Sequence, residues 1–276
     1  MTRLTAIVLV KNEEESVINR CLKSVEFCDE IIIVNDILTQ NSKVKSPHFA
    51  QGLRGARQKY NSKVKSYFRE LGKDFASQRN FGMEKATGEW ILFVDTDEEV
   101  TEELKNVILN LIQDLNQIPK RVRNDTIAYY IKRRDFFWGH EMKYGETSKA
   151  RNKGIIRLMK KNSGKWMGQV HEEFKISGQI GYLNGYLNHY PHQTVKEFIQ
   201  SVNFYSSLRA EELYKQGKKT NIFEIIFYPL FKFKLTYFIK LGFLDGPAGF
   251  AYSFFMSFHS LLVRLKLYQK LYLNNG

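Results

Sequence analysis

The sequence predicts an α/β fold: a mixed sheet flanked by helices, followed by a helical C-terminal extension. Through residue 118, short runs rich in β-forming residues alternate with segments of helical periodicity. This alternation is typical of parallel strands joined by crossover helices on both faces of a sheet. After Pro119, strand-like runs are separated by loops rich in Gly, Lys and aromatic residues, which indicates that a mixed-sheet extension completes the domain.

The strands are predicted from short apolar runs that end in turn residues. A continuous apolar run of this kind is typical of a parallel strand buried on both faces. In the first half such runs are residues 5–10, 30–34 and 90–94. Residues 63–69 are also expected to form a strand, as are residues 126–132, 154–159 and a strand pair within 179–190 in the second half.

The helices are predicted from apolar residues at helical spacing. Residues 13–27 carry such a stripe, residues 48–60 have helix-like character, and residues 74–86 predict a helix that stops at Gly88. Thr101 is expected to cap the next helix, because two glutamates follow it in the first turn, where the helix dipole favours them. Helical signals return over residues 194–215.

The C-terminal region has the composition of a membrane interface. Residues 221–270 contain ten of the 21 phenylalanines and only two acidic residues, Glu224 and Asp245, against six Lys and Arg. Such a basic aromatic segment suits an acidic membrane surface, although its aromatics could instead pack on the catalytic domain or a second subunit. Residues 246–263 carry no formal charge and reach the lower length limit of a membrane span. Serines at helical spacing within them favour an interfacial helix or a packed hairpin.

Bulk properties restrict the partners and the compartment. The formal charge of +13 predicts an anionic partner. Nucleic acid is not expected, because the chain has no basic stripe with stacking aromatics and no recognisable nucleic-acid-binding module. No signal peptide is expected before the first strand. The two cysteines have no Cys-x-x-Cys spacing and are expected to be packing residues in a reducing compartment.

The most informative local feature is a pair of aspartates, Asp95 and Asp97, directly after the apolar run 90–94. Ligands of open α/β sheets bind just beyond the carboxyl ends of such strands. Two carboxylates this close are costly unless a cation lies between them, and a divalent ion bridged to a diphosphate meets that need. The alternative is that both aspartates solvate a loop and cap the next helix.

Together, the motifs resemble those of the family-2 inverting glycosyltransferases with a GT-A fold, in particular the lipopolysaccharide-core β-1,4-glucosyltransferases. The order and spacing of the matching segments carry the resemblance, and the block from Ala86 to Glu98 is the most specific of them. These segments are residues 6–14, 29–36, 74–82, 86–98, 157–161, 170–172 and 240–246.

The resemblance implies a set of donor-binding residues. Val10, Asn12 and Glu14 match the loop that receives the base and ribose, and Asn35 and Asp36 match the acidic pair that binds uracil and ribose. Arg79 matches a basic residue near the pyrophosphate, and Asp95, Thr96 and Asp97 match the Asp-x-Asp motif, with Mg²⁺ or Mn²⁺ held by Asp97 and Asp95. The chain departs from the family pattern at Asn35, where Asp is usual, and at residues 37–40, which replace the usual Gly-Ser-Thr-Asp.

The chemistry that the resemblance implies is a single displacement at the anomeric carbon, for which a carboxylate must take the acceptor proton. Glu172 stands at the position of the family's catalytic acid residue, and its neighbours Val170 and Phe174 would partly desolvate it. Glu173 is the rival, because adjacent side chains of an extended segment face opposite ways.

The implied function is transfer of a sugar, glucose from UDP-glucose, to an inner-core heptose of lipopolysaccharide or lipooligosaccharide. The same chemistry on another lipid-linked glycan or a capsule precursor is an alternative, as is a binding-only inactive relative. The partners would be a UDP-sugar donor, a lipid-linked saccharide acceptor and the inner-membrane surface, with the protein cytoplasmic and peripherally attached. The expected domains are a catalytic domain, 1–193, with halves 1–118 and 119–193, and the helical extension 194–276.

Overall fold

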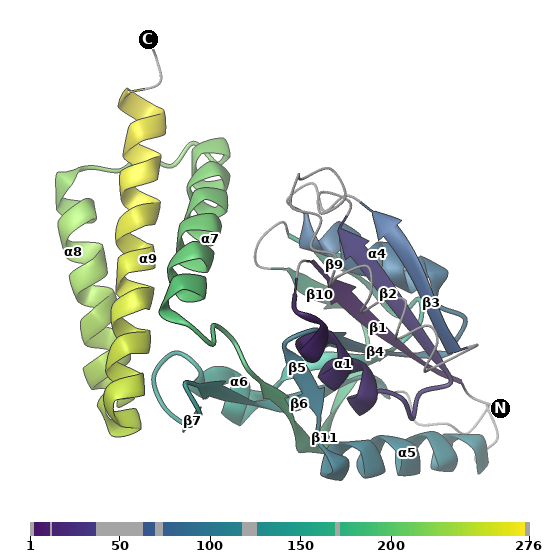
Figure 1. Ribbon diagram of the computed structural model, residues 1–276. Helices are drawn as coiled ribbons and strands as arrows, with labels where there is room; N and C mark the ends of the chain where they lie inside the picture. Colours follow the sequence, from purple (N-terminus) through teal and green to yellow (C-terminus); the bar gives the residue numbers. More distant parts are fainter. Residues whose placement is uncertain are drawn as a thin grey trace. The chain divides into compact units, whose positions relative to one another are not determined.

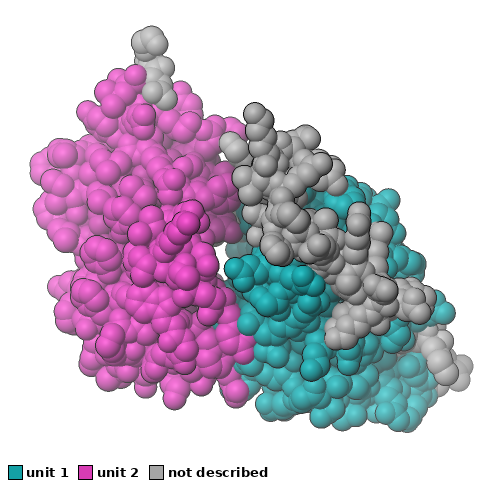
Figure 2. Space-filling view, in the orientation of Figure 1, with its two compact units in different colours: residues 1–133, 153–189 teal, residues 134–152, 190–276 magenta. Residues whose placement is uncertain are grey.

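The computed structural model describes residues 3–11, 13–36, 63–69, 74–117, 126–168 and 172–273. The chain divides into two compact units, residues 1–133 with 153–189 and residues 134–152 with 190–276, which Figure 2 colours separately. The sequence analysis placed its domain boundary after residue 193, whereas this division follows His189. The second unit also includes residues 134–152, which the sequence analysis had placed in the acceptor half of the catalytic domain.

The first unit is built on a sheet whose strands run in the order β3-β2-β1-β4-β8-β6-β11-β5. The strands β3, β2, β1 and β4 are mutually parallel, while β8 is antiparallel to β4 and β6 to β8. Their bounds are β1 (Leu4–Val10), β2 (Glu30–Asp36), β3 (Val64–Arg69), β4 (Trp90–Asp95), β5 (Glu98–Val100), β6 (Thr126–Phe137), β8 (Ile155–Lys160) and β11 (Gln179–His189). The predicted mixed sheet flanked by helices is confirmed.

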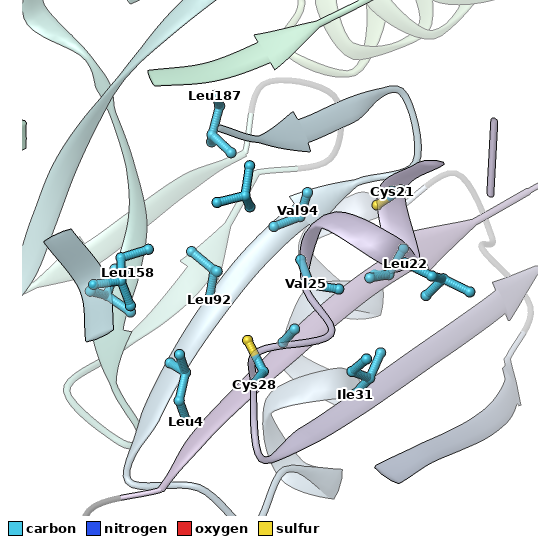
Figure 3. Close-up of a cluster of buried hydrophobic side chains, with 14 of the residues drawn as sticks. Leu4, Cys21, Leu22, Val25, Cys28, Ile31, Leu92, Val94, Leu158 and Leu187 are labelled. Atoms are coloured by element: carbon cyan, nitrogen blue, oxygen red, sulfur yellow. The ribbon is translucent and has the colours of Figure 1, made fainter. Parts of the chain in front are cut away.

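Helices cover both faces of the parallel strands (Figure 1). On one face α1 (Glu15–Ser24) and α5 (Glu102–Gln117) bury their apolar stripes against β1, β2 and β4. Figure 3 shows part of this cluster, including both cysteines, Cys21 and Cys28, which are free and buried, so their predicted packing role is confirmed. On the other face lie α4 (Phe75–Lys85) and the two-stranded sheet of β9 (Gly164–Met167) and β10 (Glu173–Ile176).

Two features differ from the sequence expectations. Residues 179–189 form one long strand, β11, where a strand pair was predicted within 179–190. Gly185 lies within this strand and takes a positive φ of 99° at a point where a Cβ would collide with the Leu104 backbone of α5. The short strand β5, paired with β11, was not predicted. The helix-like segment 48–60 lies outside the described residues.

Glu30 ties together the start of the parallel strands. Its buried carboxylate accepts hydrogen bonds from Lys65 Nζ of β3 at 2.7 Å, from Thr5 Oγ1 of β1 at 2.8 Å and from the Thr87 backbone N–H at 2.7 Å. Burial alone would raise the pKa of Glu30, but these hydrogen bonds outweigh it and lower the pKa below its usual value. The carboxylate therefore stabilises the fold in its ionised form.

The Glu30→Gln variant is expected to lose about 1–3 kcal/mol of unfolding free energy at neutral pH. Because the folded pKa is depressed, this stabilisation is present above the unfolded pKa of about 4.3 and is lost as pH falls through the folded value. Urea unfolding of both proteins at neutral and acidic pH measures the difference. Glu102→Gln, at an exposed side chain of α5, serves as the control and should change little. An equal Glu30 effect at both pH values would contradict the assignment.

The second unit is mainly helical and consists of α6 (Ser148–Lys153, except its last residue), α7 (Val195–Lys215), α8 (Ile222–Phe233), the π-helical turn η3 (Lys234–Ile239), the 3-10 turn η4 (Gly242–Asp245) and α9 (Gly246–Tyr272). A short strand, β7 (His140–Met142), pairs with the end of β6. The predicted helix at 194–215 is confirmed as α7, with a capping box between Thr194 and Glu197.

The long helix α9 packs between α7 and α8 (Figure 1), so residues 246–263 belong to the packed helical arrangement that was one of their two expected states. One residue of the predicted polar stripe, Ser257, donates a hydrogen bond to the Pro229 carbonyl of α8 at 2.7 Å. Gly249 lets α9 approach η4, because a Cβ there would overlap the Gly242 carbonyl oxygen. Among the described residues, no helix is both long enough and apolar enough to cross a bilayer.

Candidate active site

The carboxyl ends of the parallel strands bring the predicted donor-binding residues to one edge of the sheet. In the β1–β2 register Val10 lies opposite Asn35, and in the β1–β4 register Leu9 lies opposite Asp95. Asp36 closes β2 and is buried. The strand ends therefore form one continuous edge, as expected for ligand binding in an open α/β sheet.

Two arginines hold the carboxylate of Asp95. Arg79 NH2 lies 3.0 Å from Asp95 Oδ1, and Arg157 NH2 lies 2.6 Å from Asp95 Oδ2. Burial alone would raise the pKa of Asp95, but the guanidinium groups of Arg157 and Arg79 hold it well below its usual range. Asp95 is therefore ionised at neutral pH and fixed in orientation.

Arg79 of α4 links Asp95 to Glu172. Its Nε donates to Glu172 Oε1 at 3.1 Å while its NH2 contacts Asp95. The guanidinium also lies over aromatic rings, 4.9 Å from the Trp166 centroid and 5.4 Å from the Phe93 centroid. The side chain is 5% exposed, so Arg79 is a buried bridge between the end of β4 and the segment before β10. An ordinary helix-surface arginine is excluded by this burial.

Arg157 and Glu98 were not assigned roles in the sequence analysis. Arg157 NH2 lies 2.7 Å from Glu98 Oε1, and Glu98 Oε2 accepts the Asp95 backbone N–H at 3.0 Å. Glu98 is fully buried. Asp95 and Glu98 outweigh the lowering effect of burial and raise the pKa of Arg157. Arg157 therefore fixes the Asp95 side chain, while Glu98 holds Arg157 and the Asp95 backbone N–H.

Asp97 is the more open of the two motif aspartates. Its side chain is 41% exposed, against 27% for Asp95, and its Oδ2 lies 3.3 Å from His189 Nε2. Burial raises the pKa of Asp97, but the facing His189 overcomes this and lowers it. His189 belongs to the sheet, since it is the last residue of β11 and pairs with Glu98 in register.

The loop after β1 contributes a glutamate that the sequence analysis had not singled out. Glu13 Oε2 accepts the Lys11 backbone N–H at 2.7 Å, and Glu13 also has a hydrogen bond with Thr96. Burial raises the pKa of Glu13 despite these hydrogen bonds, and Asp97 raises it further. Glu14 is instead exposed at the N-terminus of α1, where its side chain makes no capping hydrogen bond. Asn12 lies outside the described residues.

Asn35 is oriented by its neighbours in the sheet. Its Nδ2 donates to Ser66 Oγ at 2.6 Å and to the Tyr67 carbonyl at 3.3 Å, both in β3. The side chain is fully buried, and within the described part of the chain its Oδ1 has no hydrogen-bond partner. A buried amide oxygen without a partner is costly. The Asn35 Oδ1 atom is therefore suited to accept a hydrogen bond from a ligand at the edge of the sheet.

The structure distinguishes the two adjacent glutamates before and in β10. Glu172 has a side chain that is 16% exposed and is held by Arg79. Glu173 is 72% exposed and pairs with Lys175. The two carboxylates therefore point into different surroundings, and Glu172 is the one in contact with the residues around Asp95. Residues 169–171 lie outside the described residues.

The donor set at Asp97 fits a divalent ion in part. A carboxylate and an imidazole in contact are both metal ligands, and carboxylate oxygens suit Mg²⁺ and Mn²⁺. Within the described ranges, no group of three or more His, Cys, Asp and Glu side chains could enclose an ion. A metal held by Asp97 and His189 would thus need further ligands from its substrate or from water, as Mg²⁺ sites on phosphates commonly do.

A comparison with protein families identifies the family of this chain. The family model described as "Glycosyl transferase family 2" matches residues 5–167. The chain belongs to glycosyl transferase family 2. The matched region of this family-2 chain contains Arg79, Asp95 and Asp97, whereas Glu172 and His189 follow it. The predicted family is confirmed, and the protein is a glycosyltransferase.

Relatives of this family-2 glycosyltransferase cover nearly its whole length. LpsC of Rhizobium meliloti, a lipopolysaccharide core biosynthesis glycosyltransferase, is 25% identical over 97% of this chain and 92% of LpsC. An uncharacterized glycosyltransferase of Rickettsia typhi is 28% identical over 97% of this chain and 87% of its own length. Among solved structures, S. aureus TarS aligns with 74% of this chain and 64% of the TarS chain, at 14% identity and a TM-score of 0.43, a likeness too distant to carry an argument.

Proposed function

We propose that this family-2 enzyme is an inverting, metal-dependent transferase that moves glucose from UDP-glucose to an inner-core heptose of lipopolysaccharide or lipooligosaccharide. One observation carries the proposal: Arg79 joins the acidic tip of β4 to Glu172. The buried Arg79 side chain thus contacts both Asp95, next to the proposed leaving-group site, and Glu172, the proposed proton acceptor. Similarity to LpsC, which is named for lipopolysaccharide core biosynthesis, supports the acceptor class.

The uridine half of the donor is assigned to the ends of β1 and β2. Asn35 offers a buried amide oxygen that has no partner among the described residues and can accept an N–H of the base. Asp36 and the loop through Val10, Asn12 and Glu14 are assigned to base and ribose, and Thr96 to the sugar-nucleotide next to Asp95. Glu13 is added to this set, because its hydrogen bond with Thr96 places it nearer the acidic tip than Glu14.

The metal is assigned to Asp97 and His189, with Asp95 at its edge. A bound Mg²⁺ or Mn²⁺ would neutralise charge that builds on the departing diphosphate. Asp97 suits this role because its carboxylate is the more exposed one and faces an imidazole nitrogen. Asp95 is occupied by two arginines, so its main task is to orient Arg79 toward the diphosphate and Glu172.

Glu172 is assigned as the general base. The acceptor oxygen attacks the anomeric carbon from the face opposite UDP, the bond to the phosphate oxygen breaks, and the hydroxyl proton passes to the Glu172 carboxylate. Arg79 fixes this carboxylate through Oε1, and Oε2 is assigned to the acceptor hydroxyl. Inversion follows because the acceptor oxygen enters on the face opposite the one from which UDP leaves.

Two alternatives share parts of this arrangement. The same chemistry could serve another lipid-linked glycan or a capsule precursor, since the acceptor is assigned by relationship alone. A binding-only protein would keep the nucleotide edge without transfer. The retained Asp97 and the buried position of Glu172 favour an active enzyme.

A donor screen tests the proposal. The purified protein is incubated with a panel of nucleotide sugars and a heptose-containing core acceptor, and released UDP is measured with and without EDTA. Acceptor-dependent UDP release from UDP-glucose, abolished by EDTA and restored by Mn²⁺ or Mg²⁺, is expected. Turnover that ignores EDTA would contradict metal dependence, and UDP binding without release from any sugar would support the binding-only alternative.

A further inference from the structure

Helix α8 is apolar on its packed side and also presents large apolar side chains to solvent. Its residues Phe223, Phe227, Leu230 and Phe231 are 60–68% exposed, and their spacing places them on one side of the helix. The opposite side, with Ile225 and Pro229, is buried. Polar contacts lie on the packed side, where Arg264 NH1 of α9 lies 3.3 Å from Glu224 Oε2. A helix in water normally shows its polar side to solvent.

The exposed apolar surface continues beyond α8. In η3, Phe238 and Ile239 are 55% and 60% exposed, and in η4 Phe243 and Leu244 are 43% and 51% exposed. Contiguous apolar surface of this kind, on consecutive elements, marks an interaction site. We call the exposed apolar side chains of α8, η3 and η4 the apolar face.

The charge carried by residues 216–263 is predominantly basic, although Glu146 pairs with Lys232 of α8 and with Lys240. Residues 216–263 are all described, and their only two acidic side chains are not available at the surface in free form: Glu224 pairs with Arg264, and Asp245 is 3% exposed. Lys218 and Lys219 precede α8, and Lys234 is exposed at the start of η3. Two copies of such a face would bring like charges together, whereas an anionic lipid surface complements them.

The lengths of the elements determine how this face can meet lipid. Helix α8 has 12 residues, which span about 18 Å at 1.5 Å per residue, well short of the hydrocarbon core of about 30 Å. The face can thus lie in the interface plane with its phenylalanines below the headgroups and its lysines among them.

We propose that α8, η3 and η4 together form a monotopic docking surface for an anionic phospholipid bilayer. The expectation from sequence was a membrane-associating extension in which residues 246–263 were the candidate interfacial helix. The structure assigns contact to α8 instead, because α9 is packed between α7 and α8.

The same unit attaches an acceptor-side loop to this surface. The buried Asp245 of η4 accepts the backbone N–H groups of Lys143 and Tyr144 at 3.0 and 2.9 Å. The connection between β7 and α6 is thereby held to a turn whose Phe243 and Leu244 belong to the apolar face. This step rests on the proposed function, which makes the acceptor lipid-linked. A lipid-linked acceptor would then reach this loop from the bilayer.

Vesicle flotation of the full chain tests the proposal. Vesicles of phosphatidylcholine alone are compared with vesicles in which phosphatidylglycerol replaces part of it. Wild-type protein is expected to float with the anionic vesicles and to be released by high salt. Phe227→Asp with Phe231→Asp should weaken partitioning by at least about a hundredfold, since each buried phenylalanine contributes about tenfold or more. Lys234→Gln should weaken it about fivefold.

Controls separate this surface from folding and from catalysis. Phe204→Asp on α7, where the ring is 42% exposed, should leave flotation unchanged. Phe227→Ser with Phe231→Ser gives a milder variant should the aspartates unfold the chain, and circular dichroism checks both. UDP release without vesicles should be the same in wild type and face variants, so a defective donor site and a defective surface give different results. Equal flotation of all variants would overturn the proposal. So would a concentration-dependent dimer, lost in the face variants, without vesicle binding; that result would assign the face to a second copy.

Discussion

Glu172→Gln is expected to lower kcat by about 10²–10⁴-fold, the usual contribution of a positioned general base. The amide retains an oxygen that can accept the Arg79 Nε–H, so the bridge to Asp95 is preserved. What disappears is the capacity to take the acceptor proton. The KM for the UDP-sugar should stay within about threefold, because the base acts on the acceptor and not on donor binding. Steady-state kinetics with the donor found in the screen measures both quantities.

The neighbouring glutamate provides the matched control. Glu173→Gln removes the same charge one residue away, from a side chain that is 72% exposed, and should leave kcat within about twofold. A dead Glu173 variant beside a normally active Glu172 variant would move the base by one residue. Equal, small losses in both would show that neither carboxylate takes the proton.

Asp97→Ala is expected to abolish transfer and to remove the gain in UDP affinity that Mn²⁺ provides. A metal that neutralises a diphosphate contributes several kcal/mol, so kcat/KM should fall by at least about a thousandfold. His189→Ala should show a smaller loss of the same kind, because its imidazole faces Asp97 Oδ2. Calorimetric titration of UDP with and without Mn²⁺ separates metal-dependent from metal-independent binding.

Asp114→Ala is the control for this series, since it removes an equivalent carboxylate from the exposed side of α5. It should leave the Mn²⁺ effect unchanged. If Asp97→Ala binds UDP with the same Mn²⁺ dependence as the wild type, the metal is held elsewhere and the assignment to this tip is wrong.

Much of the catalytic fold was predictable because its strands are buried on both faces. The continuous apolar runs of β1, β2 and β4 are typical of parallel strands covered by helices on both sides, and once the strands are parallel their carboxyl ends must meet at one edge. This places Asn35 and Asp95 together from sequence alone. Strand β11 was harder to predict, because a glycine such as Gly185 indicates a turn as readily as a close approach to a helix.

The arginine bridge and His189 were beyond prediction for a different reason. Arg157 lies in β8, which is antiparallel to β4, and its proximity to Asp95 depends on a register that no local pattern encodes. His189 reaches Asp97 only because β11 pairs with the short strand β5. The apolar face of α8 shows a third limit. A segment that is apolar nearly all round does not reveal which of its sides will be packed.

The central claim is that Asp97 and its neighbours hold a divalent ion against the diphosphate of a nucleotide sugar. Diffraction from crystals soaked with UDP and Mn²⁺, recorded for anomalous scattering, tests it most directly. The account predicts an anomalous peak in contact with Asp97 and His189 and with oxygens of the UDP diphosphate. Ordered UDP with no peak at this tip, or a peak bound elsewhere on the nucleotide, would contradict it.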